Sequence, residues 1–161
     1  MTLAHSLILE TRRLHWADEA SCAAFAQILA ARAGIHEALI ELHGPLGAGK
    51  TTFVRHLLRA LGVSGRIKSP TYAVMEPYEL PGGALAAHFD FYRFSDPREG
   101  LDAGLRDVLA APGLKIAEWP DHAAGLLPMP DLRFQIAVRD DDSRDVHVDA
   151  MTPRGVELLH G

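Results

Sequence analysis

A glycine-rich loop between two apolar segments constrains the fold more than any other feature of this sequence. The loop reads GPLGAGKT, from Gly44 to Thr51, and matches the pattern G-x4-G-K-[ST] in full. Its glycines let the backbone wrap closely around an anion, and the following helix presents its positive end to the same charge. The apolar run 38–43 before the loop predicts a buried strand, and the pattern over 51–62 predicts a helix. The sequence therefore predicts a strand, a phosphate-binding loop and a helix, in that order.

The residues of this loop have expected roles in holding a nucleoside triphosphate. Lys50 is expected to reach the β and γ phosphates, and the Thr51 hydroxyl to bind Mg²⁺. Thr52 either supports the loop or has a structural role facing the helix. A glycine turn with an incidental Lys-Thr pair is the competing interpretation, but the flanking strand and helix disfavour it. The nucleotide-binding residues expected here are Gly44, Gly47, Ala48, Gly49, Lys50, Thr51 and Thr52.

Strands and helices alternate along the rest of the chain. Strands are expected over 6–16, 38–43, 69–80, 84–94, 114–119, 132–140 and 144–150, and helices over 18–34, 51–62 and 95–111. This order predicts an α/β, P-loop NTPase-like three-layer fold with a largely parallel central sheet and a C-terminal β-hairpin. Ligands of such sheets bind at the carboxyl ends of the strands.

Local signals mark the expected ends of these elements. Asp18 or Ser21 is the expected N-cap of the first helix, and the turn 81–83, Pro-Gly-Gly, joins two strands. Ser95 is the expected N-cap of the later helix, with Pro97 in its first turn. We expect residues 1–161 to form a single P-loop ATPase domain, with an N-terminal strand within 1–17 and a peripheral tail over 151–161.

Composition excludes several classes of function. The 161 residues carry a net charge of −5, so the basic surface expected of a nucleic-acid-binding protein is absent and no strong direct binding is expected. Cys22 is the single cysteine, which rules out an intrachain disulfide and predicts a buried structural thiol. Since no segment approaches the roughly 20 apolar residues of a membrane span, we expect a cytoplasmic protein without a membrane anchor.

Two acidic residues lie at or near the ends of apolar runs and are candidates for catalysis and for binding the metal. A phosphate loop needs a carboxylate near its Mg²⁺, and hydrolysis needs a group that orients water. Asp90 and Glu118 fit these roles, although each is also explained as a surface carboxylate. In an extended strand His88, Asp90 and Tyr92 share one face, with Arg93 opposite unless the strand has already turned. Taken alone, His88 is better explained as a structural histidine.

Two further positions have alternative interpretations. The segment 68–71, Lys-Ser-Pro-Thr, follows the loop helix, where such proteins carry a segment that responds to the γ-phosphate. A turn capped by Ser69 and Thr71 explains it equally well. Trp119 either stacks on a nucleotide base or fills a gap beside Pro120, and its residue type alone favours packing.

Four segments, GPLGAGKTTF, KSPTYAVMEPY, HFDFYR and EWP, together resemble the TsaE family of small bacterial P-loop ATPases. The resemblance runs from about position 18 to 139. It implies an ATP- and Mg²⁺-dependent hydrolase in tRNA threonylcarbamoyladenosine biosynthesis that does not modify tRNA itself. It also implies a TsaD–TsaB complex as the partner, which stimulates hydrolysis and is reset by it. The implied roles are phosphate and Mg²⁺ ligands for Lys50 and Thr51, a switch-like threonine for Thr71, essential acids for Asp90 and Glu118, and a nucleotide neighbour for Trp119.

Two alternatives share the phosphate loop. A small-molecule kinase would add an acceptor pocket and an arginine-rich lid, but Arg98, Arg106 and Arg133 are scattered. A nucleotide-gated binding module would use ATP only to favour one docked state.

Overall fold

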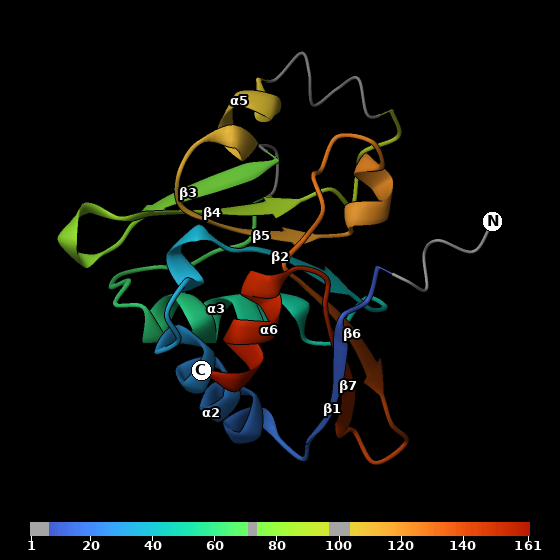
Figure 1. Ribbon diagram of the computed structural model, residues 1–161. Coiled ribbons are helices and arrows are strands. Elements are labelled where there is room, and N and C mark those ends of the chain that lie inside the picture. Colours follow the sequence, from blue (N-terminus) through green and yellow to red (C-terminus); the bar gives the residue numbers. More distant parts are fainter. Residues whose placement is uncertain (1–6, 71–73, 97–103) are drawn as a thin grey trace.

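The computed structural model describes residues 7–70, 74–96 and 104–161. Its strands form one seven-stranded sheet in the order β1-β7-β6-β2-β5-β4-β3 (Figure 1). The strands are β1 (Glu10–Trp16), β2 (Leu39–His43), β3 (Met75–Glu79), β4 (Leu85–Asp90), β5 (Leu114–Glu118), β6 (Leu132–Val138) and β7 (Arg144–Ala150). The α-helices are α2 (Glu19–Ala30), α3 (Lys50–Ala60), α5 (Leu105–Ala110) and α6 (Pro153–His160), and short 3-10 turns are η1 (Ile35–Glu37), η2 (Pro81–Gly83) and η3 (Pro120–Ala123).

The centre of the sheet is parallel and its margins are antiparallel. Strand β2 pairs in parallel with β5 and β6, and β4 pairs in parallel with β5. The outer pairs β1–β7, β6–β7 and β3–β4 are antiparallel. This arrangement confirms the predicted α/β fold, its largely parallel centre and its late hairpin of β6 and β7.

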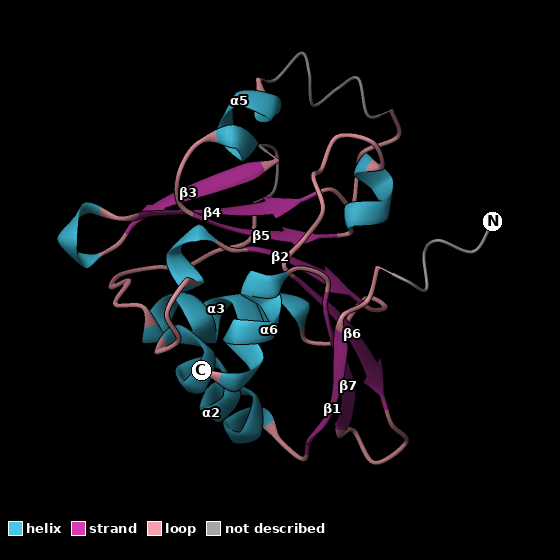
Figure 2. Ribbon diagram, in the orientation of Figure 1, coloured by secondary structure: helices cyan, strands magenta, loops and turns pink. Residues whose placement is uncertain are grey.

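Helices α2, α3 and α6 lie together on one face of the sheet, as Figure 2 shows. The core on this side contains Phe53 of α3, whose ring centroid lies 4.9 Å from that of Phe134 and 5.7 Å from that of Trp16. Alternate residues of the strands point into this core, among them Ile40, Leu42 and Ile116. The pattern of period two therefore sets which strand residues face α3.

A smaller apolar cluster lies on the opposite face, beneath α5 and η3. It contains Phe89 of β4, Ala117 of β5, Leu109 of α5 and Ala123 of η3. Because Phe89 and Ala117 point to this side, their neighbours in β4 and β5 point to the face that carries α3. The two candidate acids, Asp90 and Glu118, thus lie on the same face of the sheet as the helix that follows the phosphate loop.

Several predicted boundaries agree with the structure. The Asp18 carboxylate accepts a hydrogen bond from the Ser21 N–H at 2.9 Å, so Asp18 is the N-cap of α2. The turn 81–83 joins β3 to β4, and Gly62, with φ of 101°, follows the end of α3. The first strand is shorter than predicted, beginning at Glu10.

The later helix is confirmed in its described part, where α5 spans Leu105–Ala110 and has Gly104 at its N-cap, with φ of 72°. The start predicted after Ser95 stays a prediction, because residues 97–103 lie outside the described ranges. Pro97 lies outside the described residues, as does Thr71. The left-handed conformation of Gly104 is costly for other residues, and the apolar pattern alone did not indicate it.

The prediction of a peripheral tail over 151–161 was also wrong. Residues 153–160 form α6, which begins at the N-cap Thr152 and buries Leu158 and Leu159 in the main core. Asp131 ties this helix to the sheet. One of its carboxylate oxygens accepts from the Leu39 N–H at 2.8 Å and the other from the Thr152 hydroxyl at 2.6 Å. A short helix with only two buried leucines gives a weak pattern, which explains why the sequence did not reveal it.

Cys22 is buried on α2, as expected of a structural thiol. Burial, and secondarily the charge of Glu19, raises the pKa of its thiol to about 12. Across the described parts of the chain, every helix is too short or too polar to cross a membrane.

Candidate nucleotide site

The phosphate loop connects β2 to α3, and two of its glycines have conformations that other residues rarely adopt. Gly44 has φ of 153°, and a Cβ there would lie 2.7 Å from the Ile136 carbonyl oxygen. Gly49, with φ of 103°, is the N-cap of α3 and has no side chain to close the end of the helix. The loop therefore passes close to β6 and leaves the amino end of α3 open, as an anion site requires.

Lys50 is folded over this loop. Its side chain is only 5% exposed, and its ammonium group donates to the carbonyl oxygens of Gly44 and of Pro45, the latter at 2.9 Å. Burial lowers the pKa of Lys50, while the nearby carboxylates of Glu118 and Asp90 act in the opposite direction. A cation is thus held at the mouth of the loop, next to two acids.

Thr51 and Glu118 are in direct contact. The Thr51 hydroxyl donates to the Glu118 carboxylate, with oxygen–oxygen distances of 3.1 and 2.9 Å. Glu118 is the last residue of β5 and is 2% exposed. The loop residue expected to bind Mg²⁺ and the strand-end acid expected beside it therefore lie within hydrogen-bond distance of each other.

His88 reaches the same carboxylate from the neighbouring strand. Its Nε2 lies 2.7 Å from a Glu118 oxygen, and the ring is 1% exposed. The other ring nitrogen, Nδ1, is buried and has no hydrogen-bond partner among the described residues. An imidazole whose Nε2 donates to the carboxylate fixes the orientation of Glu118. His88 thus contacts the candidate site, while its burial agrees with the structural role that its sequence context favoured.

Asp90 lies beside Glu118 because the two residues are paired across β4 and β5. Burial raises the pKa of Asp90, and the Tyr92 N–H, which donates to its carboxylate at 2.9 Å, opposes that shift. Strand β4 ends at Asp90, so the prediction that Tyr92 continues the same extended face was wrong. The chain turns at Tyr92 and Arg93, and both of them line the site.

Trp119 lies on the Lys50 side of the loop. The Lys50 nitrogen is 4.3 Å from the centroid of its ring, within the range of a cation–π contact. The ring also contacts Tyr92 at 5.0 Å and His122 at 5.4 Å between centroids. Trp119 has φ of 54° and ψ of 47°, a left-handed conformation that is rare for a bulky residue.

These side chains surround a cavity of about 510 Å³ at the carboxyl ends of β4 and β5. Every described residue of the predicted site except Gly44 lines this cavity. The Gly44 carbonyl oxygen accepts a hydrogen bond from the Lys50 ammonium group, and Lys50 lines the cavity. Thr71 lies outside the described residues, although Pro70 and Val74 on either side of it line the cavity. The lining residues are Leu46, Gly47, Ala48, Gly49, Lys50, Thr51, Thr52, Pro70, Val74, Asp90, Tyr92, Arg93, Phe94, Glu118, Trp119 and Arg144.

A second cavity, of about 370 Å³, lies on the other side of the loop. Its wall includes the start of α2 at Asp18 and Glu19, and the buried residue Cys22. It also includes Asp141 and Asp142, which lie in the turn between β6 and β7. The two cavities share four lining residues: Ala48, Gly49, Thr52 and Arg144. They therefore meet along the final residues of the phosphate loop.

Arg144 lines both cavities, although its position in the sequence gave no indication of a site residue. The guanidinium group of this residue, the first of β7, donates from Nε to the Ala48 carbonyl oxygen at 2.8 Å. The surrounding sequence suggested only a strand after a polar loop. A link across 96 positions leaves no local signal.

The oxygen ligands present suit Mg²⁺. This ion takes one or two carboxylates, hydroxyl and phosphate oxygens, and several waters. Thr51, Glu118 and Asp90 supply such a partial set. Within the described ranges, no group of three His, Cys, Asp or Glu side chains forms a complete metal site. These residues would accordingly hold the ion together with a nucleotide rather than alone.

A parallel sheet with a glycine loop between β2 and α3, and acids at the ends of adjacent strands, defines a P-loop α/β protein. A family model described as threonylcarbamoyl adenosine biosynthesis protein TsaE matches residues 16–146. The chain belongs to the TsaE family.

Individual relatives agree with this assignment. The tRNA threonylcarbamoyladenosine biosynthesis protein TsaE of Haemophilus influenzae is 36% identical over 135 residues, 84% of either chain. The protein of the same name from Bacillus subtilis is 33% identical over 116 residues, 72% of either chain. The crystal structure of Bacillus subtilis YdiB superimposes with a TM-score of 0.75 at 25% identity, covering 94% of this chain and 93% of that one.

Proposed function

We propose that this protein binds ATP with Mg²⁺ at the phosphate loop and hydrolyses it in support of tRNA threonylcarbamoyladenosine biosynthesis. The contact between Thr51 and Glu118 is the observation that carries the proposal. It joins the hydroxyl that binds Mg²⁺ in such loops to an acid at the end of the adjacent strand. If the glycine loop were only a structural turn, the burial of this acid beside a threonine and a lysine would have no explanation.

Lys50 and the loop supply the binding of the phosphates. The ammonium group of Lys50 now donates to two loop carbonyls, and phosphate oxygens are stronger, charged acceptors for the same protons. The open amino end of α3 adds its positive partial charge. ATP therefore meets binding groups that are already oriented, and of these only the Lys50 side chain has to move.

Glu118 and Asp90 divide the remaining roles between the metal and the attacking water. Hydrolysis breaks the bond between the γ-phosphorus and the bridging oxygen, while a water oxygen bonds to phosphorus and gives up a proton. Catalysis of this step rests on positioning and on charge. We assign Glu118 to the water or the metal, since His88 holds it in place, and Asp90 to the same ion directly or through water.

We assign the nucleoside to the second cavity. The β and γ phosphates belong beside Lys50 and Thr51, so the rest of the nucleotide continues past the last loop residues toward Thr52. The second cavity begins there, and its acidic wall offers acceptors for ribose hydroxyls and for an exocyclic amino group. Trp119 lies on the phosphate side, so we assign it to the phosphate end and not to the base.

The partner proposed for this ATPase is a TsaD–TsaB complex, in the cytoplasm. Family membership supports it, and so does the net charge of −5, which leaves contact with tRNA to the partner. In this role hydrolysis is slow for the protein alone, is raised by the complex, and resets it.

The test is ATP hydrolysis with Mg²⁺, alone and with a TsaD–TsaB complex, for the native protein and Lys50→Ala. Stimulation that disappears in the variant supports the proposal. Normal ATP binding without stimulation overturns the role of the partner, and transfer of labelled γ-phosphate to a metabolite would indicate a kinase. If a non-hydrolysable analogue supports repeated rounds of the partner reaction as well as ATP does, the protein is a nucleotide-gated module.

A further inference from the structure

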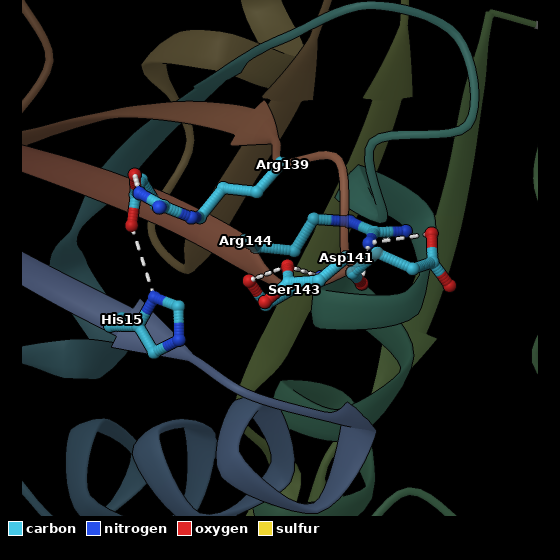
Figure 3. Close-up of polar contacts among 7 residues, drawn as sticks. His15, Arg139, Asp141, Ser143 and Arg144 are labelled. Atoms are coloured by element: carbon cyan, nitrogen blue, oxygen red, sulfur yellow. Dashed lines mark hydrogen bonds and ion pairs between the residues drawn. The ribbon is translucent and has the colours of Figure 1, made fainter.

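Arg144 connects the β6–β7 hairpin to the carbonyl groups of the phosphate loop. Its Nε donates to the Ala48 carbonyl oxygen at 2.8 Å, and a second nitrogen donates to the Gly47 carbonyl oxygen at 3.3 Å. The third nitrogen pairs with the Asp142 carboxylate at 3.2 Å. Figure 3 shows the guanidinium group extended from the hairpin toward the loop. All three of its nitrogens are thus engaged, two of them with backbone oxygens of the loop.

This contact determines which way the loop's amide groups point. In a trans peptide the C=O and N–H point in opposite directions, and no peptide bond among the described residues is cis. Arg144 holds the Ala48 carbonyl on its own side, so the N–H of Gly49 in the same peptide unit is turned away from Arg144. A phosphate loop binds its anion through such inward N–H groups, whose carbonyls must find donors on the outside. Arg144 is the outside donor for two consecutive carbonyls.

The hairpin that carries Arg144 is itself fixed by local hydrogen bonds. Asp141 accepts from both the N–H and the hydroxyl of Ser143, at 3.0 and 2.5 Å, which closes the turn before the arginine. On the other side of the hairpin, Asp145 pairs with Arg139 at 2.7 Å and with His15 of β1 at 3.0 Å (Figure 3). Arg144 therefore extends from an anchored base, and its guanidinium group has a defined place.

We propose that Arg144 is a positioning residue that holds the phosphate loop ready for the nucleotide. It acts on the carbonyl side of the loop, so it orders the N–H groups before binding and lowers the entropy cost of binding. Its charge also lies within the wall shared by the two cavities, where it favours an anion. This inference rests on the proposed nucleotide binding but concerns a residue outside the loop, the strand-end acids and the aromatic cluster.

The test compares Arg144→Met and Arg144→Lys with Arg139→Met as the matched control. Arg139 is on the same hairpin and is also paired with an aspartate, but its side chain points to Asp145 and contacts no residue of the phosphate loop. The affinity for labelled ATP with Mg²⁺ is measured by equilibrium dialysis. The hydrolysis rate is measured at saturating ATP, and stability by urea unfolding without nucleotide.

We expect Arg144→Met to weaken ATP binding about tenfold, equivalent to about 1.4 kcal/mol. Its kcat at saturating ATP should stay close to native, because the guanidinium group contacts loop carbonyls and not the reacting atoms. The ATP affinity of Arg144→Lys should lie between those of the native protein and Arg144→Met, since one ammonium group can keep one of the carbonyl contacts. Arg139→Met should bind as the native protein does.

Three results would overturn the inference. One is native affinity in Arg144→Met, and another is an equal loss in Arg139→Met, which would indicate a general effect of the hairpin. The third is a fall in kcat with unchanged affinity, which would place Arg144 in the reaction itself. Failure of the native protein to bind ATP would instead contradict the proposed function, so the two failures are distinguishable.

Discussion

The Thr51 hydroxyl donates to the Glu118 carboxylate, 3.1 and 2.9 Å from its two oxygens. The two side chains therefore satisfy each other's hydrogen-bonding groups. His88 contacts the same carboxylate from β4, so Glu118 would keep one partner if Thr51 bound a metal instead.

Replacing Glu118 by glutamine should separate binding from hydrolysis. The amide keeps the size of the side chain and an acceptor for the Thr51 hydroxyl, but it loses the charge that orients water or holds the metal. We expect ATP binding to be retained and partner-stimulated hydrolysis to fall by about 100-fold or more. Dialysis with labelled ATP and phosphate release give the two quantities. Native turnover in Glu118→Gln would show that Glu118 has no role in the mechanism. Glu41→Gln, the same substitution on β2, serves as the control.

Nucleotide binding should change the fluorescence of both Trp119 and Trp16, which line the first and the second cavity. The chain has two tryptophans. Trp16 packs against Phe53 and lines the second cavity, to which the nucleoside is assigned, whereas Trp119 lines the larger cavity beneath the Lys50 ammonium group. When Lys50 moves to the phosphates, the contact with the Trp119 ring is altered. Titration with ATP and Mg²⁺ should give a signal from Trp119 in Trp16→Phe and a signal from Trp16 in Trp119→Phe. No signal in Trp16→Phe would contradict the position assigned to Trp119, and no signal in Trp119→Phe would contradict the position assigned to the nucleoside.

Gly155→Ala should destabilise the protein, although alanine is the better helix former. In an exposed helix, replacing glycine by alanine raises the free energy of unfolding by about 1 kcal/mol. Here a Cβ would lie 2.0 Å from the Asp131 carbonyl oxygen, so α6 must move off the sheet. We expect a net loss of about 1–3 kcal/mol in the free energy of unfolding. Urea unfolding measures it, with the exposed Glu157→Ala on the same helix as control; equal stability of the two variants would show that α6 is not closely packed.

The thiol of Cys22 should react slowly at pH 8. Burial raises its pKa from 9.0 to about 12, so the thiolate, the reactive form, is scarce in the folded protein. This pKa shift also makes stability depend on pH. Folding favours the neutral thiol, so the contribution of Cys22 to the free energy of unfolding is complete below pH 9 and is lost as the pH rises toward 12. Alkylation by iodoacetamide, followed by mass, should be fast in urea and slow without it. Equal rates would show that Cys22 is accessible.

Much of the site was predictable because its signals are local. The glycine loop, the strand before it, the helix after it and the acids at strand ends each lie within a few residues. The contact between Arg144 and Ala48 joins positions 96 apart and depends on β7 lying two strands from β2. Helix α6 was missed for a similar reason, since Asp131 positions it through Thr152 and Leu39. Interactions that only the strand order creates leave no pattern in the sequence.

The parallel pairing of β4 with β5 restricts how this chain can change length. Successive side chains in a strand point to opposite faces, so one residue inserted into β4 ahead of His88 would turn both His88 and Asp90 away from Glu118. An insertion in the turn at Gly82 and Gly83 would leave that pairing intact, because a Cβ at either glycine meets no atom within 4 Å. Among related sequences, gains and losses of single residues should therefore gather at that turn and avoid the strand.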